Sequence, residues 1–590
     1  MTQPEEHLFH EFPPVSKAEW QAQVCADLKE KPYESIVWQT PDGFALEPWH
    51  SAESANKHLA IPTTKAVNSW NNCHRIVVND ALTANKAAHR CFALDASALE
   101  FVMSEPALCC ADKLNQLLAG INLAAVAIHF SGNLPPAVEL LATLAIIPGF
   151  TENAGGLLVA TDVVSTVQDE RVFELGTSLP NFRFLAVDTE PFHDKGSTAA
   201  QEIAFALAGA SDLLHRFGED SVPIEAIVAA MEIILPVGSS HFTELAKPRA
   251  LRYLFGHLLQ AYGTSGDTLP RLFARTSQRN RSLLDPYTNL LRLTTEAISA
   301  TLGGYETVQI GAFDGGLSVA PESAERITGN IHLILKEEGA LDRVVDPARG
   351  SNYIEMLTRN LAESAWNIFK EIEVAGGFAE ATKRGIIDQM IAEVEAKRRK
   401  TLNNRKKTVI GVNRYSWPLT PEQETNMEAL KLVAKAATDG NETAAYELLR
   451  LKMRTHSIAL SRTPSVFIWM VGDPSISFRQ ATFAEDLFNC GGFAIAGKAS
   501  LPLEERSYAT ALQQPPEIVV LCIAEKDPLP TAEMLCTTVR SLNSKVIVVM
   551  AGKPPQEHQQ LLDAGLDSFI YTGINVLDLL TSYQRKIGVQ

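Results

Sequence analysis

The sequence has little cysteine and no excess of positive charge, and each shortage excludes a class of protein. Its 8 cysteines in 590 residues include no Cys-x-x-Cys pair, and the histidines do not cluster. We therefore expect reduced thiols, with neither a disulfide scaffold nor a metal site. The net charge of −17 repels phosphate backbones and anionic lipids, so neither nucleic acid nor a membrane is an expected partner.

Long apolar runs are also missing. The longest, at 116–128 and 226–237, are interrupted by Asn122 and Glu232 and are shorter than the roughly 20 residues that a membrane span needs. The first residues carry Glu5 and Glu6 where a secretory signal would place basic residues. We therefore predict a cytoplasmic protein without a transmembrane helix.

What the sequence does contain is a regular alternation of apolar β-rich runs with helical patterns. From about residue 75 such runs occur at 75–80, 124–132, 156–162 and 182–189. This alternation predicts a parallel sheet with crossover helices, and its length to about residue 395 suits a closed (β/α)8 barrel. The barrel is expected over residues 46–395. A helix is predicted after Gly196, with Ser197 as its candidate N-cap.

The regions on either side of the barrel have a different composition. Residues 1–45 mix proline, glutamate and aromatic residues, and predict an N-terminal arm with one helix over Lys17–Lys29. The segment 396–462 begins with seven basic residues within 397–407, which we interpret as a solvated helix end and linker. We expect the arm to wrap a partner subunit, because Phe9, Phe12 and Trp20 have little local core.

The pattern of strands and helices is clearest in the last part of the chain, residues 463–590. Five apolar strands at 466–472, 493–497, 517–524, 545–552 and 568–571 are separated by helical patterns near 479–489, 531–541, 556–564 and 575–585. Five strands with intervening helices predict a flavodoxin-like or Rossmann-like domain. Such domains bind ligands beyond the carboxyl ends of their strands, here the loops after Gly472, Ala524 and Gly552.

Several longer motifs carry a resemblance. They are ELAKPRA at 244–250, LDPYTNLLRLTTEAISATLGGYETVQIGAFD at 284–314, ERITGNIHLILKEEG at 325–339, VVDPARGSNYIE at 344–355 and VIGVNRY at 409–415. In this order they resemble adenosylcobalamin-dependent acyl-CoA mutases, above all methylmalonyl-CoA mutase. The resemblance implies a TIM (β/α)8 barrel followed by a cobalamin-binding-type domain.

The chemical positions of that family are altered. Its catalytic chains present Asp-x-His-x-x-Gly after the first strand of the cobalamin domain, where the imidazole ligates cobalt. Aligned without gaps, these three positions fall on Ser475, Ser477 and Gln480, and no histidine lies between His456 and His558. We therefore expect no cobalamin on this chain.

The barrel is altered at the position of the family's active-site histidine. The alignment through Gly196 places Pro191 there, and proline has no side chain that donates or accepts a proton. His193, two residues on, is the one nearby substitute. The strand before it alternates Phe184, Ala186 and Asp188 with bulky neighbours, so we predict that side chains fill the barrel axis.

A retained scaffold with altered chemical positions implies a catalytically silent small subunit. Its expected partner is a large catalytic subunit that carries adenosylcobalamin and interconverts methylmalonyl-CoA and succinyl-CoA in a heterodimer. The alternative is a divergent cobalamin-dependent acyl-CoA isomerase that uses His193 and Asp188. A third hypothesis is a regulatory module that senses an acyl-CoA or a nucleotide.

Overall fold

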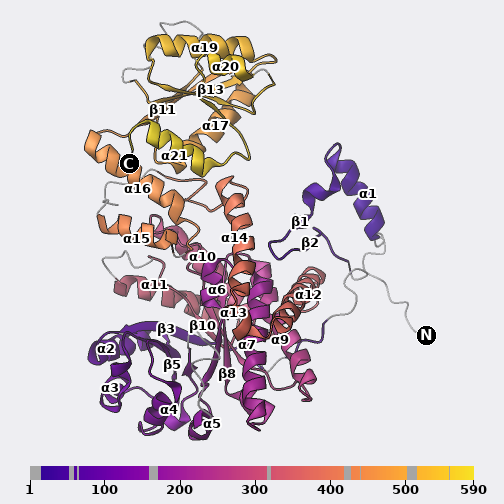
Figure 1. The fold of residues 1–590 in the computed structure, drawn as a ribbon, viewed down its shortest axis with the longest axis vertical. Helices are drawn as coiled ribbons and strands as arrows, with labels where there is room; N and C mark the ends of the chain where they lie inside the picture. Colours follow the sequence, from indigo (N-terminus) through magenta and orange to yellow (C-terminus); the bar gives the residue numbers. More distant parts are fainter. Residues whose placement is uncertain are drawn as a thin grey trace, which may run out of the picture.

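The computed structural model describes residues 15–51, 59–62, 65–158, 171–314, 321–417, 427–438, 440–500, 515–556 and 558–589. The described chain forms an elongated body (Figure 1). The eight-stranded sheet with its helices lies at one end, a five-stranded sheet lies at the other, and α14 to α16 run between them.

The larger sheet is parallel throughout, in the order β6-β5-β4-β3-β10-β9-β8-β7. A parallel bridge between Gly156 and Arg183 joins its two ends. The predicted (β/α)8 barrel is therefore the observed architecture. Its strands are β3 (Asn71–Val78), β4 (Ala98–Met103), β5 (Ala127–Gly132), β6 (Gly156–Leu157), β7 (Leu185–Asp188), β8 (Met231–Val237), β9 (Arg271–Thr276) and β10 (Thr307–Gln309).

Helices follow the barrel strands and surround the sheet. They are α2 (Ala81–Cys91), α3 (Ala111–Leu117), α4 (Ala137–Ala145), α5 (Arg171–Gly176), α6 (Glu190–Lys195), α7 (Ala199–Glu219), α8 (Ile224–Ala229), α9 (His241–Ala261), α10 (Pro286–Leu302), α11 (Pro321–Leu333), α12 (Asn352–Val374) and α13 (Phe378–Lys383). The predicted helix after Gly196 is α7, but the choice of Ser197 as its N-cap was wrong. Thr198 is the cap, because its hydroxyl accepts from the Gln201 N–H while the Gln201 side chain accepts from the Thr198 N–H.

Three helices connect the two sheets: α14 (Ile386–Asn403), α15 (Met427–Thr438) and α16 (Ala444–Leu460). The basic run at 397–407 covers the end of α14 and the turn after it. Four of its residues make ion pairs, among them Lys407 with Glu442 and Arg405 with Asp486. These two pairs tie the end of α14 to residues that precede α16 and to the C-terminal part of the chain.

The smaller sheet has the order β12-β11-β13-β14-β15, which is the flavodoxin-like order 2-1-3-4-5. All five predicted strands are present, as β11 (Ser465–Gly472), β12 (Ala494–Ala499), β13 (Ile518–Ala524), β14 (Ile547–Ala551) and β15 (Ser568–Ile570). The predicted helices are α17 (Pro474–Cys490), α19 (Leu529–Leu542), α20 (His558–Asp563) and α21 (Val576–Lys586). Separate apolar clusters cover the two faces of this sheet.

The N-terminal segment lies beside the barrel rather than in it (Figure 1). Its helix α1 (Lys17–Leu28) matches the predicted helix and has no buried residue. A short hairpin of β1 (Trp38–Gln39) and β2 (Ala45–Leu46) follows. The predicted anchors Phe9 and Phe12 lie outside the described residues, whereas Trp20 stacks near Trp49 with ring centroids 5.2 Å apart.

Across the described ranges, no helix combines the length and apolar character that crossing a bilayer requires.

Candidate functional site

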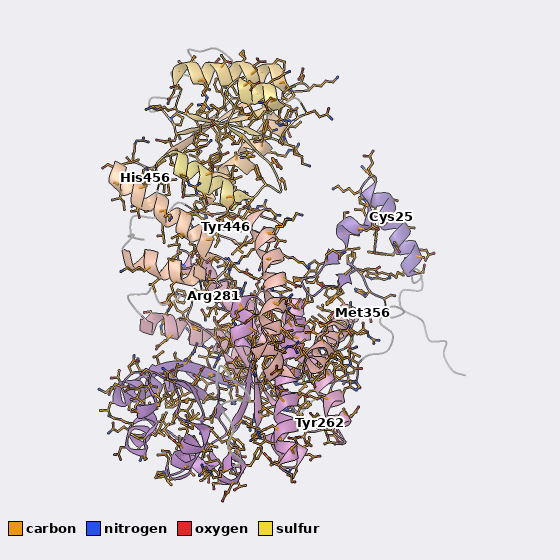
Figure 2. All side chains as sticks on the ribbon, viewed as in Figure 1. Cys25, Tyr262, Arg281, Met356, Tyr446 and His456 are labelled. Atoms are coloured by element: carbon orange, nitrogen blue, oxygen red, sulfur yellow. The ribbon has the colours of Figure 1, made fainter. Side chains whose placement is uncertain are left out.

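Apolar side chains fill one level of the barrel interior. They form a separate buried cluster, to which β3, β4, β5, β7, β8 and β9 each contribute one residue: Cys73, Ala98, Ala127, Ala186, Ile234 and Phe273, with Leu158 just after β6. All are at most 9% exposed. Barrel interiors are normally closed by such layers. Figure 2 shows how densely side chains occupy the end of the molecule that holds the barrel.

Charged side chains occupy a second level, with Arg275 of β9 at its centre. Its guanidinium lies 2.7 Å from Glu100 of β4, 3.3 Å from Asp188 of β7 and 2.5 Å from Glu190. The Ser131 hydroxyl donates to Glu100 at 2.6 Å. Arg275, Glu100 and Asp188 are all at most 3% exposed. We call these five residues the barrel ion network.

Burial and pairing act in opposite directions in this network. Burial raises the pKa of Asp188 to about 7, although Arg275 opposes that rise. Burial would also raise the pKa of Glu100, but Arg275 and Arg75 outweigh it and hold the pKa below its usual value. The surrounding carboxylates keep Arg275 protonated despite its burial. Arg275 is therefore the main partner of these carboxylates, while Glu100 Oε2 and Arg275 Nε are buried without a hydrogen-bond partner among the described residues.

The family's histidine position, Pro191, lies in the short helix α6 directly after β7. The helix begins here because Asp188 accepts from the Glu190 N–H at 2.8 Å and proline is favoured in a first turn. Pro191 is half-buried. Its ring presents no hydrogen-bonding side chain at the carboxyl end of the barrel.

His193, two residues further on, is buried and has both ring nitrogens engaged. Nδ1 donates to Glu202 Oε1 at 2.7 Å, and Nε2 lies 2.7 Å from the Ser277 hydroxyl oxygen. Lys247 donates to the other oxygen of Glu202, also at 2.7 Å. Burial would raise the pKa of Glu202, but Lys247 and His193 lower it to about 2. The imidazole therefore links α7 to the loop after β9.

The three cobalamin-ligand positions lie on α17, not on an extended loop. Ser475 is exposed in the first turn, the buried Ser477 hydroxyl donates to the Asp473 carbonyl at 2.8 Å, and Gln480 is half-buried. The helix was predicted near 479 and begins five residues earlier. Asp473 caps it by accepting from two backbone N–H groups, and Pro474 occupies the first helical position.

The carboxyl edge of the smaller sheet is tightly packed where its strand order reverses. A Cβ on Gly472 would lie 2.4 Å from the Ala524 carbonyl oxygen, and the Asp473 N–H donates to that oxygen at 2.9 Å. In the next loop, Glu525 accepts from the Thr531 hydroxyl at 2.6 Å. A helical serine cannot stand in for an imidazole on cobalt, so the residues at this edge do not fit a corrinoid held by its lower ligand.

Metal chemistry has no evident support elsewhere in the described part of the chain, where no three His, Cys, Asp or Glu side chains are grouped to hold an ion.

Sequence reasoning did not find the barrel ion network or the partners of His193. Two strands contained a signal, because Glu100 and Arg275 each interrupt an otherwise apolar run. A charge in a strand that is buried on both faces must find a partner inside the barrel. The partners Glu100 and Ser277 lie far away in sequence, and only the closed sheet brings them together.

Comparisons with known proteins agree with this scaffold. The family model for methylmalonyl-CoA mutase matches residues 164–457. A methylmalonyl-CoA mutase small subunit from Porphyromonas gingivalis is 28% identical, and the alignment covers 100% of both chains. The small subunit from Streptomyces virginiae is 33% identical over 70% of this chain and 66% of its own length.

A protein named probable methylmalonyl-CoA mutase small subunit, from Mycobacterium tuberculosis, is 27% identical over 95% of this chain and 94% of its own length. The methylmalonyl-CoA mutase of Escherichia coli is 31% identical, but over only 42% of this chain and 35% of its own length. Thus the likeness to the small subunits extends over both sheets, and the chain belongs to the methylmalonyl-CoA mutase family.

Proposed function

We propose that this chain is the small, catalytically silent subunit of a heterodimeric methylmalonyl-CoA mutase in the cytoplasm. Its large partner would bind adenosylcobalamin and interconvert methylmalonyl-CoA and succinyl-CoA. The role of this chain would be to stabilise that partner through a large interface, in the obligate range above roughly 2,000 Å².

The observation that carries this proposal is the filled barrel. Substrate chemistry along the axis of a barrel requires room there, and Arg275 with Glu100 and Asp188 occupies that space as a buried ion network. Opening it would leave charges unpaired away from water, which is costly. The serines at the cobalt-ligand positions support the same proposal.

The experiment is a comparison of the lone chain with the complex. The full chain would be titrated with adenosylcobalamin and followed by its visible spectrum, then co-expressed with its large subunit for mutase assays. We expect no spectral change up to high micromolar cofactor, a 1:1 complex, and activity only when the large subunit is present. Tight corrinoid binding or activity of the lone chain would instead establish the divergent-isomerase alternative.

A variant of His193 distinguishes the silent-subunit proposal from the divergent-isomerase alternative. In the silent-subunit proposal, His193→Gln lowers the melting temperature, because Glu202 and Ser277 lose a buried partner, and leaves the kcat of the complex unchanged. If His193 acted on substrate, kcat would fall at a temperature where the variant remains fully folded.

A further inference from the structure

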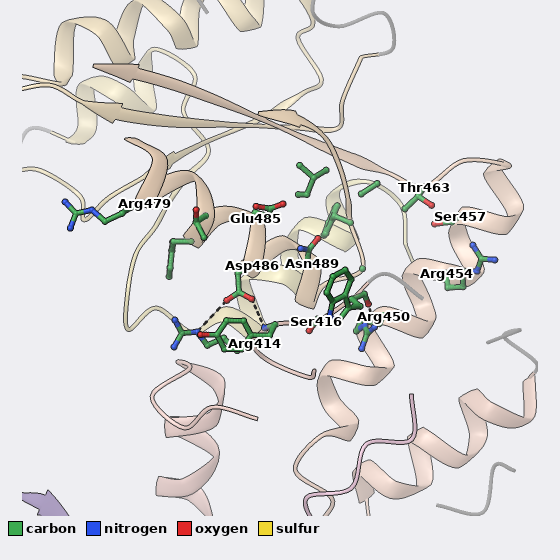
Figure 3. A pocket seen from close by; sticks show the side chains of 18 of the residues that line it. Arg414, Ser416, Arg450, Arg454, Ser457, Thr463, Arg479, Glu485, Asp486 and Asn489 are labelled. Atoms are coloured by element: carbon green, nitrogen blue, oxygen red, sulfur yellow. Dashed lines mark hydrogen bonds and ion pairs between the residues drawn. The ribbon is translucent and has the colours of Figure 1, made fainter. Parts of the chain in front are cut away.

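A cavity of about 1080 Å³ lies outside the barrel, between α16, α17 and the segment 414–417. Figure 3 shows its labelled side chains, which come from these elements except for Thr463, in the turn after α16. Ala494 and Ile495, at the start of β12, also line it, so it lies away from the carboxyl edge of the smaller sheet. Small-molecule sites commonly measure about 300–1,000 Å³, so a nucleotide-sized ligand has room here.

The cavity carries more positive than negative charge that is available to a ligand. Four arginines line it against two acids, Glu485 and Asp486. Both acids already have partners, and one of these is Arg414, which lies 3.7 Å from Asp486. Asp486 accepts from the Tyr415 N–H at 2.7 Å and pairs with Arg405, and Glu485 lies 2.5 Å from Lys498.

The arginines differ in what they bind. Arg450 is buried and donates to the carbonyls of Gly411 and Trp417, at 3.2 and 2.5 Å, so it holds the 411–417 segment in place. Arg454, one turn further along α16, has its Nε atom buried with no hydrogen-bond partner among the described residues. A buried N–H without a partner costs free energy, which an anionic oxygen on a ligand would recover.

Three aromatic rings add a second kind of contact. Trp417 is 80% exposed, Phe478 58% and Tyr415 57%, and all three line the cavity. Large exposed rings gathered beside a cavity mark a binding surface more than chance exposure does. Flat rings stack on heteroaromatic bases, and guanidinium groups bind phosphate through paired hydrogen bonds.

We propose that this cavity binds a phosphorylated ligand with a flat heteroaromatic ring, of the nucleotide class. Arg454 takes the phosphate, and Trp417 stacks on the ring. Thr463 and Asn489, which also line the cavity, add a hydroxyl and an amide for the polar edge of the ligand. This site is independent of the catalytic state of the barrel.

The test is isothermal titration of the purified full chain with four probes: ATP, AMP, adenosine and pyrophosphate. We expect ATP to bind most tightly, with adenosine and pyrophosphate each weaker by about tenfold or more, because each lacks one of the two contacts. Binding should also weaken with added salt, since phosphate pairing is screened.

Substitutions test the two contacts proposed for the ligand, that of Arg454 with the phosphate and that of Trp417 with the ring. Arg454→Gln and Trp417→Ala should each weaken ATP binding about tenfold or more, while Trp417→Phe retains most of it. Arg343→Gln is the matched control, because Arg343 is exposed and distant in sequence from the cavity. Trp417 is mostly exposed, so its variants should keep the wild-type melting temperature and remain informative if Arg454→Gln is destabilised.

Three results would overturn the proposal. One is the absence of heat with millimolar ATP. The second is pyrophosphate binding as tightly as ATP with no effect of Trp417→Ala, which would leave a simple anion site. The third is loss of large-subunit binding in both variants without nucleotide binding by the wild type, which would make the surface a protein interface.

Discussion

Arg275 holds its charge in the middle of the barrel, where water does not screen it. Three carboxylates surround it, and the Ser131 hydroxyl donates to one oxygen of Glu100. Such a network adds little net stability compared with apolar side chains of the same size, but losing one member leaves the others unpaired. The native state therefore depends strongly on this one residue.

Replacing Arg275 with methionine should lower the free energy of unfolding by about 3–5 kcal/mol, because Glu100 would remain buried with only the 40% exposed Arg75, 3.5 Å away, as a cation. Urea denaturation measures this. Adding Glu100→Gln to that variant should recover part of the loss, since it removes the stranded charge. The control Arg343→Met, at an exposed position, should stay within about 0.5 kcal/mol of the wild type. Equal effects of the two arginine variants would contradict the network's role.

Buried carboxylates also predict how stability depends on pH. The pKa values of Asp188 and Asp194 are raised to about 7 and about 6, mainly by burial, so their ionisation opposes folding. Stability should therefore rise as pH falls from about 7 toward the ordinary value of 3.8. Burial is outweighed by basic partners at Glu202 and Glu442, whose pKa values are lowered to about 2. Their contribution is lost between the ordinary value of 4.5 and about 2.

Urea denaturation at a series of pH values should therefore give maximal stability in mildly acidic buffer. Asp188→Asn should flatten the slope on the neutral side and leave the acid side unchanged. A wild-type profile that rises steadily from pH 5 to pH 8 would contradict this assignment.

At the scale of single elements, α17 determines which groups the carboxyl edge of the smaller sheet can offer to a ligand. Because Asp473 and Pro474 start the helix immediately after β11, the positions where a cobalt ligand would stand lie within its first turns. Their backbone groups take part in helical hydrogen bonds. A change of side chain alone does not restore an extended loop.

We therefore expect that Ser475→Asp combined with Ser477→His leaves the chain unable to displace the dimethylbenzimidazole ligand of adenosylcobalamin. The measurement is the visible spectrum during titration of the purified double variant. Its matched control is the same pair with Pro474→Gly and Asp473→Ala, which weakens the start of the helix by about 1 kcal/mol or more. Ligand displacement by the double variant alone would refute this view of α17.

The elements themselves were largely predictable, because both sheets follow apolar periodicity. All five strands of the smaller sheet matched, whereas in the barrel only β3, β5, β6 and β7 were predicted individually. Glu100 interrupts the apolar run of β4, which was missed. The start of α17 was predicted five residues late, although Asp473 as the cap and Pro474 in the first turn are typical of a helix start. The site was less predictable, since Arg275 meets Glu100 only after the barrel closes, and local patterns carry no information on such pairs.

At the scale of the whole molecule, the N-terminal segment is the least integrated part of the described chain. Helix α1 buries none of its residues, and Lys17 pairs with Glu47 rather than with the barrel. A helix that buries none of its residues contributes little to the stability of the chain that carries it. Trp20 of this helix contacts Trp49, a residue of the same N-terminal segment. Within the described residues, the rest of the helix surface is therefore free to cover a partner subunit.

Deleting residues 1–31 should leave the melting temperature of the lone chain within a few degrees of the wild type. The same deletion should weaken association with the large subunit at least about tenfold, as measured by analytical ultracentrifugation of the mixed subunits. A deletion that unfolds the lone chain, or one that leaves association unchanged, would contradict the prediction that this segment is an interaction arm.

The barrel ion network also has a consequence for the order of folding during synthesis. Glu100 and Arg275 are 175 positions apart, and β3 pairs with β10 to complete the sheet. While the first half of the barrel emerges from the ribosome, Glu100 lies on β4 between β3 and β5 but lacks Arg275, and β3 still lacks its neighbour β10. We expect this half to stay hydrated and open until β9 has been translated, so that barrel closure is a late and cooperative event.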